Sequence, residues 1–164
     1  MTNKEDYVKF LAEVRKASGV ANLTPDDSGL VSVRVDDAYN VNLQFVEATG
    51  RVLCFIEVVE LPHDAPKAVY RDLLSGGLFG KETAGGYFAL EPTTETVVYN
   101  YSFDLAVAAN DVDEFISTLE KILQLCDVWA ERIKAVLGGG AAAEDRAEVA
   151  DPAAPPQGHT IFRA

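Results

Sequence analysis

The chain has 164 residues, with 14 lysines and arginines against 26 aspartates and glutamates, which gives a formal net charge of −12 and a pI near 4.5. This length suits one domain with its own core. Nucleic acid is not an expected partner, because phosphate binding needs clustered basic residues. No stretch reaches the roughly 20 apolar residues of a membrane helix, and residues 1–6 hold no apolar signal segment. Two cysteines, Cys54 and Cys126, make no disulfide framework, so we expect a cytoplasmic protein without membrane insertion.

The composition of the chain changes at Gly138. Residues 138–164 are rich in glycine, alanine and proline and show almost no apolar periodicity, which predicts a flexible tail after a domain of residues 1–137. The tail holds two arginines and four acidic residues, a net charge of −2, which leaves −10 for the domain. The acidity therefore belongs mainly to the folded part.

The first predicted element is a helix over residues 4–18. Its apolar residues recur at helical spacing and share one face; they are Tyr7, Phe10, Leu11 and Val14. Thr2 and Glu5 have the spacing of a capping box, and Gly19 is a natural stop.

Three strands are predicted next, over residues 31–35, 41–46 and 52–59. The last two flank Thr49-Gly50, which predicts a hairpin with a two-residue loop. That loop sets a register with one apolar face, in which Phe45 pairs with Cys54, Leu43 with Ile56 and Val41 with Val58.

The opposite face of this hairpin is mixed rather than polar. Its apolar members are Val46, Leu53, Phe55 and Val59, beside Asn42, Gln44 and Glu57. Two interpretations remain open: another strand or a helix covers this face, or the face stays apolar to receive a partner chain.

A second helix is predicted from about Asp64, with Pro66 in its first turn and an end at Gly76-Gly77. Its apolar stripe consists of Val69, Tyr70, Leu73 and Leu74. Two strands follow over residues 87–91 and 96–107. A long helix over 111–137, capped by Asn110 and stopped by Gly138, completes the order α-β-β-β-α-β-β-α of an α+β fold. At 1.5 Å per residue this helix is about 40 Å long, enough to cross a five-stranded sheet.

The sequence offers little chemistry. Neither His63 nor His159 has neighbours at metal-ligand spacing, so no metal or other cofactor is expected. The glycine-rich run over residues 75–81 misses the spacing of a phosphate-binding loop and follows a helix, so it is interpreted as a helix end and a bend. Cys54 and Cys126 fall on inward faces and are interpreted as buried hydrophobic residues. No catalytic residue is assigned, and we expect no enzyme.

Over residues 3–137 the sequence resembles a known family. The stretch Tyr70-Arg71-Asp72-Leu73-Leu74-Ser75-Gly76-Gly77-Leu78-Phe79-Gly80, then Gly86-Tyr87-Phe88-Ala89-Leu90, is similar to its Leu-Leu pair, linker and following strand. The strand ending Phe103-Asp104-Leu105 and the helix with Phe115, Leu119, Leu123 and Trp129 match its final elements. The family is the class I type III secretion chaperones, the Tir-chaperone (CesT-like) group.

The resemblance implies an acidic cytoplasmic homodimer with a twisted, mainly antiparallel five-stranded sheet packed against helices. Such chaperones catalyse no reaction and bind an unfolded segment near the N-terminus of a secreted effector protein. An extended peptide can add as a strand at a sheet edge, with side-chain pockets giving selectivity. The candidate effector-binding residues are Phe10, Val14, Val46, Leu53, Phe55 and Val59. The candidate dimer interface, by resemblance, consists of Val69, Tyr70, Leu73 and Leu74, for which core packing is the alternative.

Other interpretations of the chain stay open. An α+β interaction or scaffold domain outside any secretion system fits the same pattern, as does a small-ligand-binding or enzymatic protein. Residues 159–164 return to apolar, β-prone residues after the proline-rich part of the tail. They either dock in a client groove, imitating an effector, or form an unattached end.

Overall fold

A five-stranded antiparallel sheet forms one layer of the structure, which is a computed structural model that describes residues 2–143. The strand order is β1-β2-β3-β5-β4. The strands are β1 (Leu30–Val35), β2 (Tyr39–Val46), β3 (Arg51–Glu60), β4 (Tyr87–Glu91) and β5 (Thr96–Asp104). The predicted α+β class with a five-stranded antiparallel sheet is confirmed.

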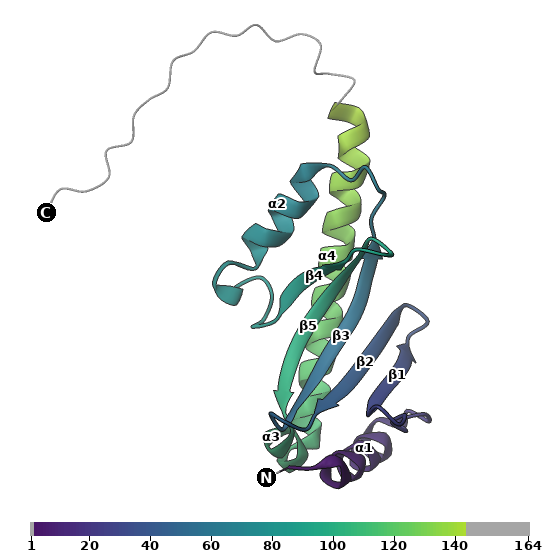
Figure 1. The fold of residues 1–164 in the computed structure, drawn as a ribbon. Coiled ribbons are helices and arrows are strands. Elements are labelled where there is room, and N and C mark those ends of the chain that lie inside the picture. Colours follow the sequence, from purple (N-terminus) through teal and green to yellow (C-terminus); the bar gives the residue numbers. More distant parts are fainter. Residues whose placement is uncertain (1, 144–164) are drawn as a thin grey trace, which may run out of the picture.

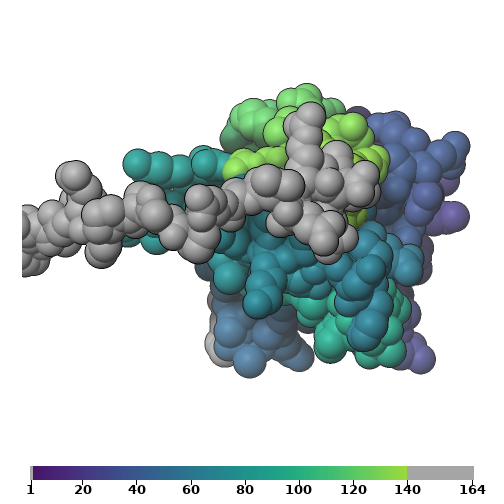
Figure 2. All heavy atoms as spheres, turned by 90° about the horizontal axis from the view of Figure 1, so that it is seen from above, coloured from purple at the N-terminus to yellow at the C-terminus, as the bar shows by residue number. Residues whose placement is uncertain are grey.

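The helices form the second layer. α1 (Lys4–Ser18), the short α3 (Leu105–Asn110) and α4 (Val112–Ala143) pack on one face of the sheet, and α4 runs behind the strands in Figure 1. α2 (Lys67–Gly76) and the 3₁₀ turn η1 (Leu78–Gly80) lie at one end, where α2 packs beside the last turns of α4. Figure 2 looks down on that end of the molecule.

The two layers enclose a continuous core. Its members come from α1, α3, the strands and the first half of α4, and the most buried include Tyr7, Leu11, Val31, Val52, Cys54, Ile56, Tyr99, Leu105, Ile122 and Cys126. A second, smaller cluster joins α2 to α4 and the end of the sheet through Leu61, Val69, Val97 and Ile133. The prediction that both cysteines are buried is confirmed.

α1 has the predicted bounds but a different cap. Asn3, not Thr2, is the N-cap: its side chain accepts from the Asp6 amide, and the Asp6 carboxylate accepts from the Asn3 amide. The box is thus shifted by one residue, because asparagine caps a helix as well as threonine does. Gly19 ends the helix with a left-handed φ of 73°, as expected.

The β2–β3 hairpin has a four-residue loop, 47–50, and not the two-residue loop that the sequence suggested. The pairing is therefore shifted by two residues, which preserves the side-chain alternation, so the predicted apolar face still faces the core. The observed pairs are Phe45 with Val52, Leu43 with Cys54 and Val41 with Ile56.

The second half of the chain differs from prediction at element ends. α2 begins at Lys67 with Pro66 as its N-cap, after Asp64. β5 stops at Asp104, before the expected 107, because the Asp104 carboxylate accepts from the amides of Ala106 and Val107 and starts α3, which was not predicted.

The long helix is capped by Asp111, whose carboxylate accepts from the Glu114 amide, and not by Asn110. It continues through Gly138 to Ala143. Glycine ends a helix where it takes a positive φ, as Gly19 does, and Gly138 has none. Residues 144–164, most of the predicted tail, lie outside the described residues.

Trp129 on α4 fixes the position of α2. Its indole nitrogen donates to the carbonyl of Glu82 at 2.9 Å, and its ring lies against Gly76 at the end of α2. A Cβ atom on Gly76 would come within 2.3 Å of the indole, whereas one on Gly77 would have no atom nearer than 3.5 Å. Only glycine fits at the end of α2.

Gly76→Ala should therefore lower the free energy of unfolding by roughly 1–3 kcal/mol, the usual cost of overpacking. Urea unfolding monitored by circular dichroism and by the emission of Trp129, the one tryptophan in the chain, measures it. Gly77→Ala is the matched control and should leave the stability nearly unchanged. Equal effects of the two substitutions would show that the indole does not limit the space at Gly76.

Candidate protein-binding surfaces

The face of the sheet opposite α4 carries no helix among the described residues (Figure 1). Two apolar side chains lie in the middle of this uncovered face, Leu53 and Phe55 on β3. Leu53 is 41 % exposed and Phe55 is half-buried. The neighbouring residues on β2 and β5 are polar: Gln44 and Ser102 flank Leu53, and Asn42 and Asn100 flank Phe55.

The polar side chains of the uncovered face bond to one another. The Ser32 hydroxyl donates to the Asn42 side-chain oxygen at 2.6 Å, and the Asn42 amide donates to the Phe55 carbonyl at 3.3 Å. The Arg51 guanidinium donates to both the hydroxyl and the carbonyl of Ser102. Because these groups are satisfied without a covering layer, the face is stable in water and holds Leu53 and Phe55 in a fixed polar frame.

Of the six candidate effector-binding residues, three lie on this uncovered face. Leu53 and Phe55 are adjacent there, and Val46 is half-buried beside the hairpin loop, opposite Arg51.

The other three do not lie there. Phe10 and Val14 are only 2 % and 5 % exposed, since they face the core, so the expectation that they are accessible is wrong. Val59 was assigned to the second face, but a β-bulge after Glu57 turns it to the helical face, opposite Val97.

The sheet has two free edges. β1 pairs with β2 alone, and β4 is so short that it pairs only with the first half of β5, from Thr96 to Asn100. Residues 101–104 of β5 therefore have no strand on that side among the described residues. The loop before β4 does not continue this pairing. It is bonded to a β5 side chain instead, since the Tyr99 hydroxyl donates to the Thr83 carbonyl at 2.7 Å.

A pocket lies directly beside this free edge and is called the β5 pocket here. Its apolar walls are Tyr101, Phe103, Val107, Ala108 and Phe115, and its acidic side chains are Asp104, Asp111 and Glu114. The volume is about 240 Å³, and no lysine or arginine lines it. Residues that pair with β5 here can place every second side chain in an apolar pocket with an acidic rim.

A second exposed apolar surface follows α2. Leu74 is 80 %, Leu78 62 % and Phe79 85 % exposed, and we call these three residues the α2 ridge. Phe79 has a φ of +58°, a strained conformation for a bulky residue. Adjacent large apolar side chains this exposed are typical of an interaction surface.

The predicted dimer interface coincides with this ridge only in part. Leu74 is exposed, Tyr70 and Leu73 are half-buried, and Val69 is 1 % exposed in the second core cluster. For Val69 the core alternative holds. Leu78 and Phe79 were not assigned, although an apolar pair inside a glycine-rich bend was a visible signal.

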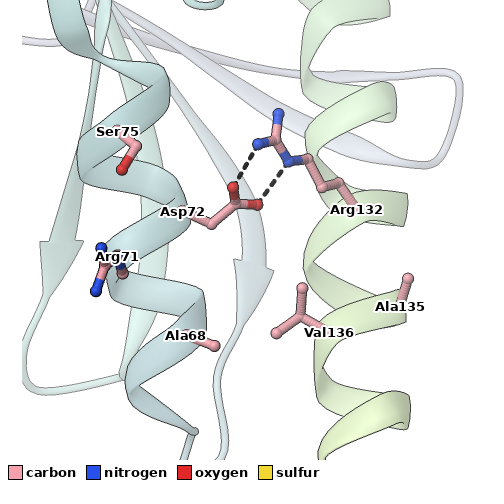
Figure 3. Close-up of a pocket in the computed structure, with 7 residues that line it drawn as sticks. All are labelled: Ala68, Arg71, Asp72, Ser75, Arg132, Ala135 and Val136. Carbon is pink, nitrogen blue, oxygen red and sulfur yellow. Dashed lines mark hydrogen bonds and ion pairs between the residues drawn. The ribbon is translucent and has the colours of Figure 1, made fainter. Parts of the chain in front are cut away.

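Arg132 on α4 ties down the segment that carries the ridge. Its guanidinium forms a two-pronged ion pair with Asp72 on α2, shown in Figure 3, and a further one with Glu82 at 2.6 Å. The same group stacks over the Trp129 ring, 4.4 Å from its centre. The hydrogen bonds that Arg132 donates to Asp72 and then to Glu82 raise the pKa of Arg132. The shallow groove around this pair, between α2 and α4, is lined by small residues such as Ala68 and Ala135.

The described residues contain little that resembles a catalytic site. Burial raises the pKa of the Cys54 and Cys126 thiols to about 12, which keeps both protonated and unreactive near neutral pH. Within residues 2–143 no three histidine, cysteine or carboxylate side chains are grouped as metal ligands. In the same part of the chain, no helix combines the length and apolar character needed to cross a bilayer.

Comparison with known proteins identifies the family. The model of the Tir chaperone protein (CesT) family matches residues 9–130, so the chain belongs to that family, and the predicted resemblance is confirmed. None of the curated proteins matches the chain by sequence.

Solved structures agree in fold. A chain of the ExsC–ExsE complex superposes with a TM-score of 0.69 at 22% identity, covering 80% of this chain and 96% of that one. A chain of the HopA1–SchA chaperone–effector complex superposes with a TM-score of 0.59 at 19% identity, covering 80% of this chain and 95% of that one. A chain of the ExoU–SpcU complex from the type III secretion system of Pseudomonas aeruginosa superposes with a TM-score of 0.53 at 16% identity, covering 79% of this chain and 95% of that one. At these identities the likeness shows the shared fold.

Arg132→Lys should loosen α2 from α4, because one ammonium cannot bridge Asp72 and Glu82 as the planar guanidinium does. We expect a red shift of the Trp129 emission and a loss of stability of about 1 kcal/mol. Lys134→Gln is the control: it removes the exposed ion pair between Lys134 and Glu131, which flank Arg132 on α4, and should change neither quantity. An unchanged emission in Arg132→Lys would contradict the bridging role.

Proposed function

We propose that the protein is a cytoplasmic, homodimeric chaperone that binds an extended segment near the N-terminus of a type III secreted effector, keeps that segment secretion-competent and catalyses no reaction. Membership of the CesT family supports the chaperone function. The HopA1–SchA complex, one chain of which has this fold, is a chaperone–effector complex. The observation that carries the proposal is the free edge of β5 beside an apolar pocket.

The client segment binds by strand addition at residues 101–104 of β5. Backbone hydrogen bonds to the edge give affinity without reading a particular sequence. Alternate client side chains enter the β5 pocket, and those between them lie on the uncovered face, where Ser102 alone separates them from Leu53. The acidic rim and the domain charge of −10 favour basic client segments and keep the free chaperone soluble.

Dimerisation uses a different part of the surface. Leu74, Leu78 and Phe79 are the most exposed large apolar side chains around α2, and a second copy of the same ridge is a partner of matching chemistry. Half-buried Tyr70 and Leu73 extend this contact, whereas Val69 supports it from the core. Client site and dimer contact therefore lie on separate elements.

The client site is tested by co-purification from the native host with mass spectrometry. One recovered protein, held by a protease-resistant segment within its first 50–100 residues or so, is the expected result. Recovery of the homodimer alone would contradict the proposal.

The location of the site is tested with Leu53→Arg and Val107→Glu, two exposed positions on either side of the β5 edge. Each should weaken binding of the recovered segment at least about tenfold, because each places a charge where an apolar contact is expected. Val128→Glu is the matched control, exposed to a similar extent on α4 and away from the pocket. If the control loses as much affinity as Val107→Glu, the client binds elsewhere.

The dimer is tested with the double variant Leu74→Asp, Phe79→Asp. Two carboxylates in an apolar contact should convert the dimer to a folded monomer, seen as a halved mass in light scattering with an unchanged circular dichroism spectrum. Val128→Asp should remain dimeric. A wild-type monomer at micromolar concentration, or a variant that stays dimeric, would rule out the ridge as the interface.

A further inference from the structure

The β5 pocket combines three properties that together specify its occupant. The free edge at residues 101–104 can pair with an extended segment. The walls formed by Tyr101, Phe103 and Phe115 favour an apolar side chain, and the acidic rim favours a basic one. At about 240 Å³ the pocket is larger than the roughly 150 Å³ that holds benzene in an engineered cavity, so one aromatic ring fits.

We propose that residues 159–164 of this chain bind the β5 pocket of the same molecule as an added strand. They read His159-Thr160-Ile161-Phe162-Arg163-Ala164 and lie outside the described residues. In an extended segment Phe162 points to one side and its two neighbours to the other. Phe162 enters the pocket, and Arg163 lies on the side of the uncovered face next to Asp104, the member of the acidic rim that β5 itself contributes.

The chain is long enough for this contact. Phe115 in the pocket and Ala143 are separated by 28 helical residues of α4, or about 42 Å at 1.5 Å per residue. The 16 residues from Ala143 to His159 span up to about 50 Å at the 3.1 Å per residue of a proline-rich extended chain. The segment therefore reaches the pocket along α4 with little slack, which favours its own pocket over more distant ones.

The inference rests on the proposed client site and adds its regulation. Tethering raises the effective concentration of the segment at the pocket, but a linker close to full extension keeps it below the millimolar range of a short flexible linker, so the contact itself must contribute affinity. A client must displace it, which sets a threshold of affinity and covers the free edge while no client is bound. The chain thus carries a substitute for its own client.

The test is hydrogen exchange of the full chain. The amides of residues 101–104 should exchange at least about tenfold faster in Phe162→Ser than in the wild type, because the edge is released. Val149→Ser, which changes an apolar residue of the same tail outside the segment, is the matched control and should exchange like the wild type. Equal exchange in wild type and Phe162→Ser overturns the proposal.

A labelled peptide of residues 157–164 gives an independent measurement that needs no client. It should bind the full-length Phe162→Ser chain at least about tenfold more tightly than the wild type, and Val107→Glu in that chain should abolish binding. Binding that ignores Val107→Glu overturns the assignment to the pocket. Protection of the edge that falls on dilution assigns the segment to a neighbouring copy and overturns the intramolecular contact. Recovery of a client by the Phe162→Ser and Val107→Glu chains is measured separately. The proposed client site and the proposed tail contact can therefore fail independently of each other.

Discussion

Helix α4 buries Ile122, Cys126 and Ile133 against one face of the sheet, and α1, α2 and the β5 pocket are arranged around it. This helix of 32 residues covers the sheet on one side only, so the opposite face has to be stable while it is in contact with water. The polar frame around Leu53 and Phe55 meets this requirement. The uncovered face can therefore remain open to a partner without exposing the hydrophobic core.

The two halves of α4 serve different surfaces. Near its start, Asp111, Glu114 and Phe115 build one side of the β5 pocket. Near its end, Trp129 and Arg132 hold α2 and the loop after it, and so fix the ridge that we assign to the dimer. Because a helix is stiff, the distance between the pocket and the ridge is set within one chain.

Sequence periodicity predicted which side chains face the core, but it did not predict where several helices and strands begin and end. An even shift of two residues in the β2–β3 register left Leu43 and Cys54 on the predicted face, since alternation depends only on parity. The bulge that reverses Val59 has no local signature, because it results from pairing with β5. The capping role of Asp104 and the passage of α4 through Gly138 were hidden for a related reason: aspartate and glycine each fit more than one backbone conformation. The β5 pocket could not be predicted, because it depends on the pairing of Tyr87, the first residue of β4, with Asn100, which leaves residues 101–104 of β5 unpaired.

The two edges of the sheet differ in how readily they accept a strand. β1 is six residues long, and its Arg34 side chain folds back along the edge hairpin, donating to Asn40 and to the carbonyl of Asp37. Short edges with charged side chains discourage pairing between copies. At the β5 edge the deterrent is electrostatic: two copies meeting there would bring like-charged carboxylates together, while a basic segment meets the opposite charge. The same acidic rim thus opposes pairing between the β5 edges of two copies while it admits a basic segment, and so limits aggregation through the edge that we assign to binding.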